Sequence, residues 1–174
     1  MQKTVTRPRA RNYLSWRRFG IIRFPLILIA TLLTANVYGS ETISMRQVSD
    51  LRQEAEVMRA GKLLLVLEFA REDCPYCHKL EKLFLLPMQR NPDYDDKILV
   101  RSISLDDNET VIDFAGRSVP TTEFAARYGV SLTPTLLFLN VDGIEISERL
   151  IGIWSEDFYG GFIDSRIETA RDSL

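Results

Sequence analysis

The pattern of apolar and polar positions divides the chain from residue 44 onward into short helices and strands. Apolar residues at helical spacing predict a helix that starts at the capping-box sequence of residues 44–47 and stops at Gly61. Two runs that are apolar on both faces, residues 63–69 and 135–139, predict central strands covered by helices on both sides. The pattern therefore indicates an α/β domain with a buried central sheet.

Prolines and capping residues mark the ends of further elements. The helix that Pro75 opens is predicted to run to about residue 84 or 86, where Pro87 bends or ends it. Residues 98–105 alternate well enough to form a second strand. If that strand is parallel to the first, the polar segment that follows, residues 106–120, lies at the sheet edge that carries Cys74. This segment is predicted to be an irregular connection.

The C-terminal third is predicted to hold a short helix, a hairpin and a last helix. The short helix spans residues 121–128 and is closed by Gly129. Asp142-Gly143 turns strand 135–139 into residues 144–151 as a hairpin. Ser155 is predicted to cap the last helix. The side chains expected to point inward from this last helix are Phe158, Phe162, Ile163 and Ile167.

Charge is distributed unevenly along the chain. Residues 1–40 hold seven Lys or Arg and no acid, whereas the rest holds 15 basic and 24 acidic residues. A net charge of this sign on the body argues against binding to nucleic acid. The basic head leads into the apolar run of residues 24–35, which has the length of a signal-peptide core and is short for a membrane span.

These features predict residues 1–39 as a signal peptide and residues 40–174 as the exported domain, with cleavage near Gly39. The alternative is an uncleaved signal-anchor that holds the protein to the membrane by residues 21–38. In either case the folded part lies outside the cytoplasm, in an oxidising compartment.

Cys74-Pro75-Tyr76-Cys77 contains the only two cysteines, and it follows the first predicted strand. Pro75 suits the first position of a helix, which places Cys74 at the N-cap, where free N–H groups and the helix dipole stabilise a thiolate. Cys74 can then attack a disulfide, and Cys77 can resolve the mixed disulfide. We therefore interpret the motif as a redox pair.

Glu68 is the only charge in the first apolar strand, and two interpretations stay open. It either lies near the strand end and reaches water, or it is a buried carboxylate beneath the cysteines. In the second case desolvation raises its pKa and it relays protons during thiol exchange.

Two alternatives to a redox pair also stay open. His78 completes the sequence C-x-x-C-H, the attachment signal for c-type haem, so Cys74, Cys77 and His78 could belong to an electron carrier. The two cysteines could instead form a structural disulfide in a binding module, although so small a loop is a weak constraint on the unfolded chain. His78 could otherwise add positive charge near the Cys74 thiolate or be exposed and inert. A zinc site would need more ligands than these three residues provide.

Beyond the C-x-x-C motif, the chain resembles the thioredoxin-like superfamily over about residues 45–171. Thr133-Pro134 stands directly before a buried strand, where this family has a cis-proline that faces the active site. Glu68 occupies the position of the family's buried acid. Asp142-Gly143 and Gly152 match its hairpin and the glycine that follows. The resemblance implies a thioredoxin fold: a central mixed β-sheet flanked by helices, here with an extra N-terminal helix.

The resemblance also implies a function, and it is strongest to exported bacterial proteins such as the thioredoxins of sulfur-oxidation operons. It implies a periplasmic thiol:disulfide oxidoreductase and allows a reductase, an oxidase or an isomerase. Among these we expect a protein that reduces or exchanges protein disulfides rather than isomerising them. Cys74, Cys77, Glu68 and Pro134 would carry the reaction. Thr133, Pro75 and Tyr76 would bind substrate.

The same resemblance extends to cofactors and partners. The only redox group would be the Cys74–Cys77 disulfide, with no cofactor and no metal. The partners would be protein disulfides and a membrane thiol:disulfide electron donor, and the protein would be a monomer. Two departures from the family stand out. Asp73 replaces the tryptophan that thioredoxins have before the first cysteine, and segment 106–120 is longer than in a minimal thioredoxin. We expect this segment either to shape substrate choice or to be an ordinary solvated loop.

Overall fold

The computed structural model describes residues 44–174. The predicted signal peptide, its cleavage near Gly39 and the alternative membrane anchor lie outside the described residues. Within residues 44–174, no helix has the length and apolar character needed to cross a membrane.

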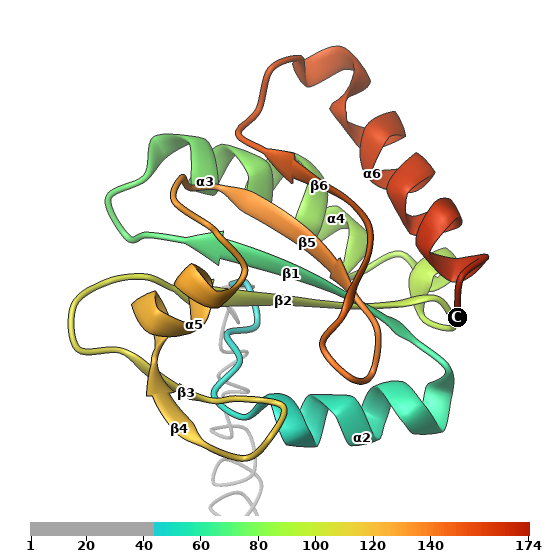
Figure 1. The fold of residues 1–174 in the computed structure, drawn as a ribbon. Helices are drawn as coiled ribbons and strands as arrows, with labels where there is room; N and C mark the ends of the chain where they lie inside the picture. The colour runs from blue at the N-terminus through green and yellow to red at the C-terminus, as the bar shows by residue number, and fades with distance from the viewer. Residues whose placement is uncertain (1–43) are drawn as a thin grey trace, which may run out of the picture. The chain divides into compact units, whose positions relative to one another are not determined.

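A four-stranded mixed sheet forms the centre of the domain, in the order β2-β1-β5-β6 (Figure 1). β1 (Leu64–Ala70) runs parallel to β2 (Ile98–Ser104) and antiparallel to β5 (Thr135–Leu139). β6 (Glu145–Ile151) pairs antiparallel with β5. Every residue of β1 and β5 is buried, which confirms the prediction that the two apolar runs form the central strands.

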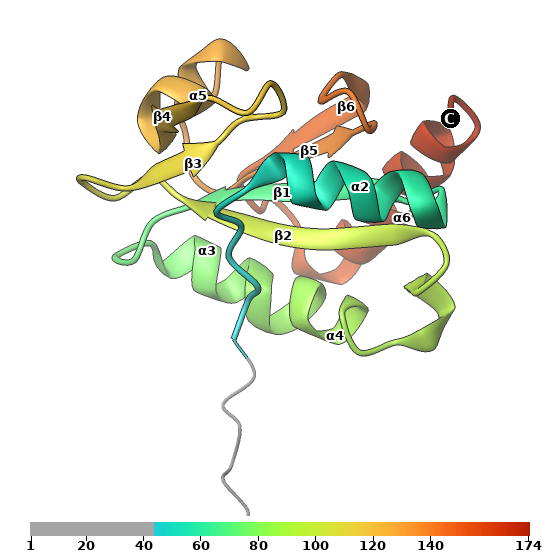
Figure 2. The ribbon, with the colours of Figure 1, turned by 90° about the horizontal axis from the view of Figure 1, so that it is seen from below.

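Helices cover both faces of this sheet (Figure 2). One face carries the helical segment that follows the cysteine motif, together with the last helix. The other face carries the first helix and the short helix after the β3–β4 hairpin. The bounds on the first face are α3 (Pro75–Leu80), the π-helical turn η1 (Glu81–Leu85), α4 (Leu86–Met88) and α6 (Glu156–Arg171). The bounds on the second face are α2 (Leu51–Gly61) and α5 (Thr121–Arg127). A short 3-10 turn, η2 (Pro92–Tyr94), precedes β2.

Alternation along β1 decides which side chains enter which core. Leu64 and Val66 belong to the core beneath α3, α4 and α6, whereas Leu65, Leu67 and Phe69 belong to the core beneath α2 and α5. Side chains of a strand point alternately to opposite faces, so Glu68 lies on the same face as Leu64 and Val66. This places its carboxylate under the helix that carries the cysteines.

The first helix starts later than predicted. It begins at Leu51, and Asp50 caps it by accepting hydrogen bonds from the N–H groups of Arg52 and Gln53. The predicted capping box at residues 44–47 is wrong because this stretch pairs with the sheet instead. The N–H of Val48 donates to the carbonyl of Ser102 at 3.0 Å, so the backbone here is extended rather than helical.

The segment of residues 106–120 is not irregular. It contains a small antiparallel hairpin, β3 (Thr110–Ile112) and β4 (Ser118–Pro120), so the prediction of an irregular connection is wrong. The side chain of Asp113 organises the loop, because it accepts hydrogen bonds from the N–H groups of Ala115 and Arg117. The backbone N–H groups of this loop therefore find hydrogen-bond acceptors within the loop itself.

The hairpin turn between β5 and β6 forms as predicted. Gly143 has a φ of 75°, a conformation that side chains disfavour. A Cβ atom at this position would also lie 2.5 Å from the ring of Phe114. Pro87 does not end the preceding helical segment, which continues through α4 to Met88; its missing N–H falls at the start of that short helix.

The buried stripe of α6 is rotated from the predicted one. Tyr159, Ile163, Ile167 and Ala170 are buried, whereas Phe158 is 70% exposed and Phe162 is 40% exposed. Ile163 and Ile167 are confirmed as inward, and the two phenylalanines are wrong. Successive helical residues differ by about 100° around the axis, so a stripe that starts at Tyr159 turns Phe158 and Phe162 outward. The side chain of Ser155 makes no capping hydrogen bond, although α6 starts directly after it.

Candidate active site

Cys74 and Cys77 form a disulfide at the N-terminus of α3, with 5.2 Å between their Cα atoms. Cys74 is the N-cap residue and Pro75 is the first residue of the helix. The N–H of Cys77 points at the Cys74 sulfur, 3.1 Å away, and the N–H of His78 donates to the Cys74 carbonyl at 3.1 Å. The Cys77 N–H is shared with the Cys74 carbonyl at 3.0 Å. The Cys74 sulfur therefore meets the positive end of the helix and one of its backbone donors, which favours negative charge there.

The two sulfur-bearing residues differ in exposure. Cys74 is 9% exposed, whereas Cys77 is completely buried beside Ala70. Of the two cysteines, only Cys74 reaches the surface. Attachment of a haem through both cysteines would require the Cys77 sulfur at the surface, so the haem interpretation does not fit this geometry.

The loop before β5 packs against the same sulfur. The hydroxyl of Thr133 lies 3.6 Å from the Cys74 sulfur, within the distance of a hydrogen bond to sulfur. The Thr133–Pro134 peptide bond is cis, and the carbonyl of Pro134 accepts a hydrogen bond from Gly152 at 2.8 Å. Two segments that are 59 residues apart in sequence thus meet at Cys74.

Glu68 is completely buried on β1, and neither carboxylate oxygen has a hydrogen-bond partner among the described residues. Burial raises the pKa of Glu68 to about 8, and the nearby negative charge of Glu81 adds to this rise. The hydroxyl of Ser102, its register partner on β2, lies close enough to lower the pKa somewhat. The prediction that this strand holds a buried carboxylate is therefore confirmed, and the alternative that it reaches water is wrong.

Two neighbours of Glu68 were not singled out by the sequence pattern. Glu81 follows Cys77 by four residues, the spacing that places side chains on one face of a helix. Tyr159 on α6 is buried, and its hydroxyl donates to the Gly152 carbonyl at 2.7 Å. Burial raises the pKa of Tyr159, and the charge of Glu68 adds to this rise. The Cys77–Glu81 spacing was visible in the sequence, but the inward face of α6 was not.

The remaining predicted residues lie at the rim. Pro75 and Tyr76 are exposed on the first turn of α3, and the Tyr76 side chain is 60% accessible. Leu132, directly before Thr133, is 63% exposed. The ring of His78 is also exposed, and its Nε2 lies 2.8 Å from the backbone carbonyl of Glu72. Apolar side chains thus stand on two sides of the Cys74 sulfur.

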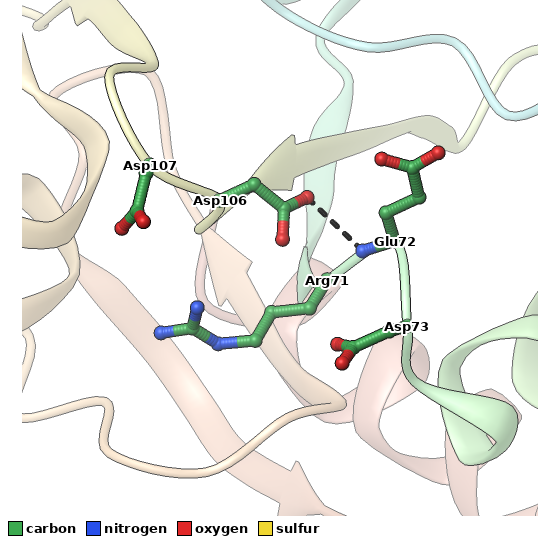
Figure 3. Close-up of a pocket in the computed structure, with 5 residues that line it drawn as sticks. All are labelled: Arg71, Glu72, Asp73, Asp106 and Asp107. Carbon is green, nitrogen blue, oxygen red and sulfur yellow. Dashed lines mark hydrogen bonds between the residues drawn. The ribbon is translucent and has the colours of Figure 1, made fainter.

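A shallow pocket of about 540 Å³ lies beside the N-terminus of α3 (Figure 3). Its lining residues are Arg71, Glu72, Asp73, Asp106 and Asp107. Asp106 accepts a hydrogen bond from the Glu72 N–H at 3.0 Å and so ties the start of segment 106–120 to the loop before Cys74. The prediction that this segment begins at the edge that carries Cys74 is confirmed.

A sequence model of the thioredoxin-like domain matches residues 51–162, which is well over half of the chain. The chain belongs to the thioredoxin-like family. Its order of strands and helices, with a central mixed sheet between helices, is the fold of this family. The predicted superfamily and fold class are confirmed.

Solved thioredoxins resemble this thioredoxin-like chain at low identity. The periplasmic thioredoxin SoxS from Paracoccus pantotrophus, in its reduced form, is 22% identical with a TM-score of 0.43, covering 62% of this chain and 98% of its own. The germline-specific thioredoxin Deadhead from Drosophila melanogaster is 21% identical with a TM-score of 0.46, covering 70% and 98%. No curated protein sequence matches the chain.

Membership of this family, together with the C-x-x-C pair at a helix N-terminus, identifies the protein as a thiol:disulfide oxidoreductase. Enzymes of this kind exchange two thiols for one disulfide through the cysteines themselves. Within residues 44–174, no group of three or more His, Cys, Asp or Glu side chains is arranged to hold a metal ion.

Proposed function

We propose that the protein is exported by residues 1–39 and that residues 40–174 reduce or exchange protein disulfides in the periplasm, with Cys74 as the nucleophile. The observation that carries this proposal is the asymmetry of the two cysteines. Cys74 is accessible at the helix N-cap, with the Cys77 N–H and the Thr133 hydroxyl directed at its sulfur. Cys77 is buried below it.

The reaction proceeds in two steps. The Cys74 thiolate attacks a substrate disulfide, forms a mixed disulfide and releases one substrate sulfur as a thiolate. The Cys77 sulfur then attacks Cys74, forms the internal disulfide and releases the second substrate sulfur. Cys77 must lose its proton for this second step, and Glu68 lies on the face of β1 beneath α3. We assign Glu68 as the base, and its raised pKa of about 8 suits proton transfer near neutral pH.

Substrate binding is assigned to the rim of the site. Thr133 and Pro134 stand on one side of Cys74, and Pro75 and Tyr76 stand on the other. Pro75, Tyr76 and Leu132 supply the exposed apolar surface, whereas Thr133 is half-buried and Pro134 is buried behind it. This surface suits a peptide segment next to a disulfide, and an extended peptide can reach Cys74 without reaching Cys77. A membrane thiol:disulfide donor returns the Cys74–Cys77 disulfide to the dithiol, and the protein acts as a monomer without a cofactor.

Substrate trapping tests this proposal. The Cys77→Ala variant should accumulate mixed disulfides through Cys74, whereas Cys74→Ala should accumulate none. In the reduced protein, limiting iodoacetamide should label Cys74 before Cys77. Preferential labelling of Cys77, or equal trapping by both variants, would contradict the assignment of the nucleophile. Cell fractionation of the full chain tests its export.

A further inference from the structure

The Glu68 carboxylate is isolated from solvent. It has no exposed surface, and neither oxygen has a hydrogen-bond partner in the part of the chain that the structure describes. Leu136 faces it in register from β5, and Ser102 faces it from β2. A base that takes a proton from Cys77 must also release it before the next cycle. The geometry therefore requires a group that connects Glu68 to water.

Glu81 occupies the position that such a group needs. It lies four residues after Cys77, so both side chains project from one face of the helical segment toward the sheet. Cys77 packs on Ala70, which shares a face of β1 with Glu68. Glu81 is half-buried, so its carboxyl group lies between the interior and the surface.

The local backbone is also unusual at this point. Glu81 is the first residue of the π-helical turn η1, and its N–H is shared between the carbonyls of Cys77 and His78. A π-turn inserted in a helix widens it and often accompanies a functional site. Here the wider turn follows directly on the segment that carries the cysteines.

We propose that Glu81 carries the proton between Glu68 and solvent during thiol exchange. This inference rests on the proposed function, because it assumes that Glu68 serves Cys77. In this proposal Glu81 acts through Glu68 rather than on the reacting sulfurs.

The Cys77 thiol gives its proton to the Glu68 carboxylate, and its sulfur forms a bond to the Cys74 sulfur. The bond between Cys74 and the substrate sulfur breaks, and its electron pair leaves with the substrate as a thiolate. Glu68 passes the proton to the Glu81 carboxylate, Glu81 passes it to water, and the released thiolate takes up a proton from solvent. The dithiol is oxidised and the substrate disulfide is reduced.

The charged and titratable groups around Glu68 define how pH should act. The charge of Glu81 acts on it from η1, Tyr159 senses it from α6, and β2 contributes the Ser102 hydroxyl; Cys77 on α3 packs on Ala70 of the same strand face. Burial raises the pKa of Glu81, and the charge of His78 opposes this rise. Near neutral pH, Glu68 begins mostly protonated, and it must lose a proton before it can act as a base.

A chromogenic aromatic disulfide, dithiobis-nitrobenzoate, separates the two steps when it is mixed rapidly with the reduced full-length protein. The first coloured thiolate reports attack by Cys74, and the second reports attack by Cys77. Near neutral pH, Glu81→Gln should leave the first release unchanged and slow the second by about tenfold, less than a full general base contributes.

The direction of this change is decisive. If Glu81 acted only through its charge, its removal would lower the pKa of Glu68, leave more Glu68 ionised and make the second release faster. A faster or unchanged second release would therefore overturn the relay. The conservative variant Glu81→Asp keeps a carboxylate and should recover most of the lost rate. If Glu81→Gln folds poorly, the rate of the second release in Glu81→Asp, compared with wild type, still tests the relay.

The matched control is Glu56→Gln. Glu56 is exposed on α2, across the sheet from the cysteines, and its substitution changes the net charge equally. Both releases should keep their rates in this variant. A first release that does not depend on Cys74 would contradict the proposed function itself. If Glu81→Gln leaves both the first and the second release at the wild-type rate, the relay through Glu81 is contradicted, but the proposed function is not.

Discussion

Glu68 and Asp113 are carboxylates that are almost completely removed from solvent, and their surroundings are opposite. Glu68 is fully buried in the central strand without a hydrogen-bond partner for either oxygen. Asp113 is 3% exposed in the β3–β4 loop. It accepts hydrogen bonds from the N–H groups of Ala115 and Arg117 and from the side chains of Arg117 and Arg127.

The pKa values move in opposite directions for this reason. Burial is the largest cause at Glu68, and with the charge of Glu81 it raises the pKa to about 8 against a smaller opposing effect of Ser102. Burial also pushes the pKa of Asp113 upward, but the hydrogen bonds from Arg117 and Arg127 outweigh it and hold the pKa well below its ordinary value. Desolvation penalises a charged group, and partners decide whether that penalty is offset.

The comparison separates a structural carboxylate from a reactive one. Asp113 stays ionised and its hydrogen bonds hold the β3–β4 loop together, so its role is to stabilise the fold. Glu68 costs stability when ionised and sits beneath the cysteines, where a proton must be taken and returned. An unpaired buried acid in this place is consistent with a functional role rather than with a structural one.

The largest expected effect is on the pH dependence of stability. The folded protein holds a proton on Glu68 that the unfolded chain releases, so the contribution of Glu68 to stability should be fully present below about pH 4.5 and be lost as pH rises toward 8. The loss across this window is at most about 5 kcal/mol. Glu68→Gln should abolish this slope, as measured by urea unfolding of the oxidised protein at several pH values. Equal slopes in both proteins would show that Glu68 does have a partner.

Asp113→Asn should act in the opposite direction. It keeps the shape of the side chain but removes the charge that the two arginines bind, so it should lower the free energy of unfolding by about 2 kcal/mol at neutral pH. Because the folded pKa is lowered, the wild-type advantage should disappear as pH falls below the ordinary aspartate value. Urea unfolding at neutral and acid pH checks both points. If the wild-type protein remains more stable than Asp113→Asn in acid, the charge of Asp113 is not the cause of the difference in stability.

The two carboxylates should also differ in their effect on exchange. Glu68→Gln should slow the Cys77 step by about 10- to 100-fold, because it removes the base. The wild-type rate of this step should rise with pH and level off above about 8, where Glu68 is ionised. Asp113→Asn should leave both steps unchanged in the rapid-mixing assay. Equal slowing by the two substitutions would indicate a general loss of structure.

The smallest expected effect is at the arginines that bind Asp113. Arg127→Met removes a cation whose side chain is 34% exposed, and Arg117→Met removes one that is 67% exposed. Both should destabilise the protein less than Asp113→Asn does, and Arg127→Met should destabilise it more than Arg117→Met. Thermal unfolding of the three variants gives this order. The reverse order would mean that the exposure of the arginine does not determine how much each ion pair contributes to stability.

Much of the site could be predicted because its signals are local. Cys74, Pro75 and Cys77 predict a helix that starts with a reactive sulfur, since the spacing of three residues and the proline at the first position are local constraints. The apolar runs of β1 and β5 predict burial on both faces, and Glu68 falls inside the first run. Thr133-Pro134 marked the loop that contacts Cys74, although this assignment rested on the family resemblance.

Other features could not be predicted because the local sequence is equally compatible with more than one structure. Residues 44–47 have the form of a capping box, yet the edge of the sheet takes their backbone and Asp50 caps the helix. In α6, several apolar residues allow two inward stripes, and packing against Phe84 and the sheet selects the one with Tyr159. A polar composition hid the β3–β4 hairpin, which is stabilised by Asp113 and by contact with α2.

The sequence by itself determined the chemistry that this protein can perform: two cysteines at the start of a helix and a single acid in a buried strand. Only the tertiary structure decided which groups complete the site. It brings Thr133 to the Cys74 sulfur, leaves Glu68 without a partner and places Glu81 beside it. Local spacing sets a helix cap or a strand face, whereas the environment of a buried charge depends on every element packed around it. That environment, rather than residue identity, separates Glu68 from Asp113.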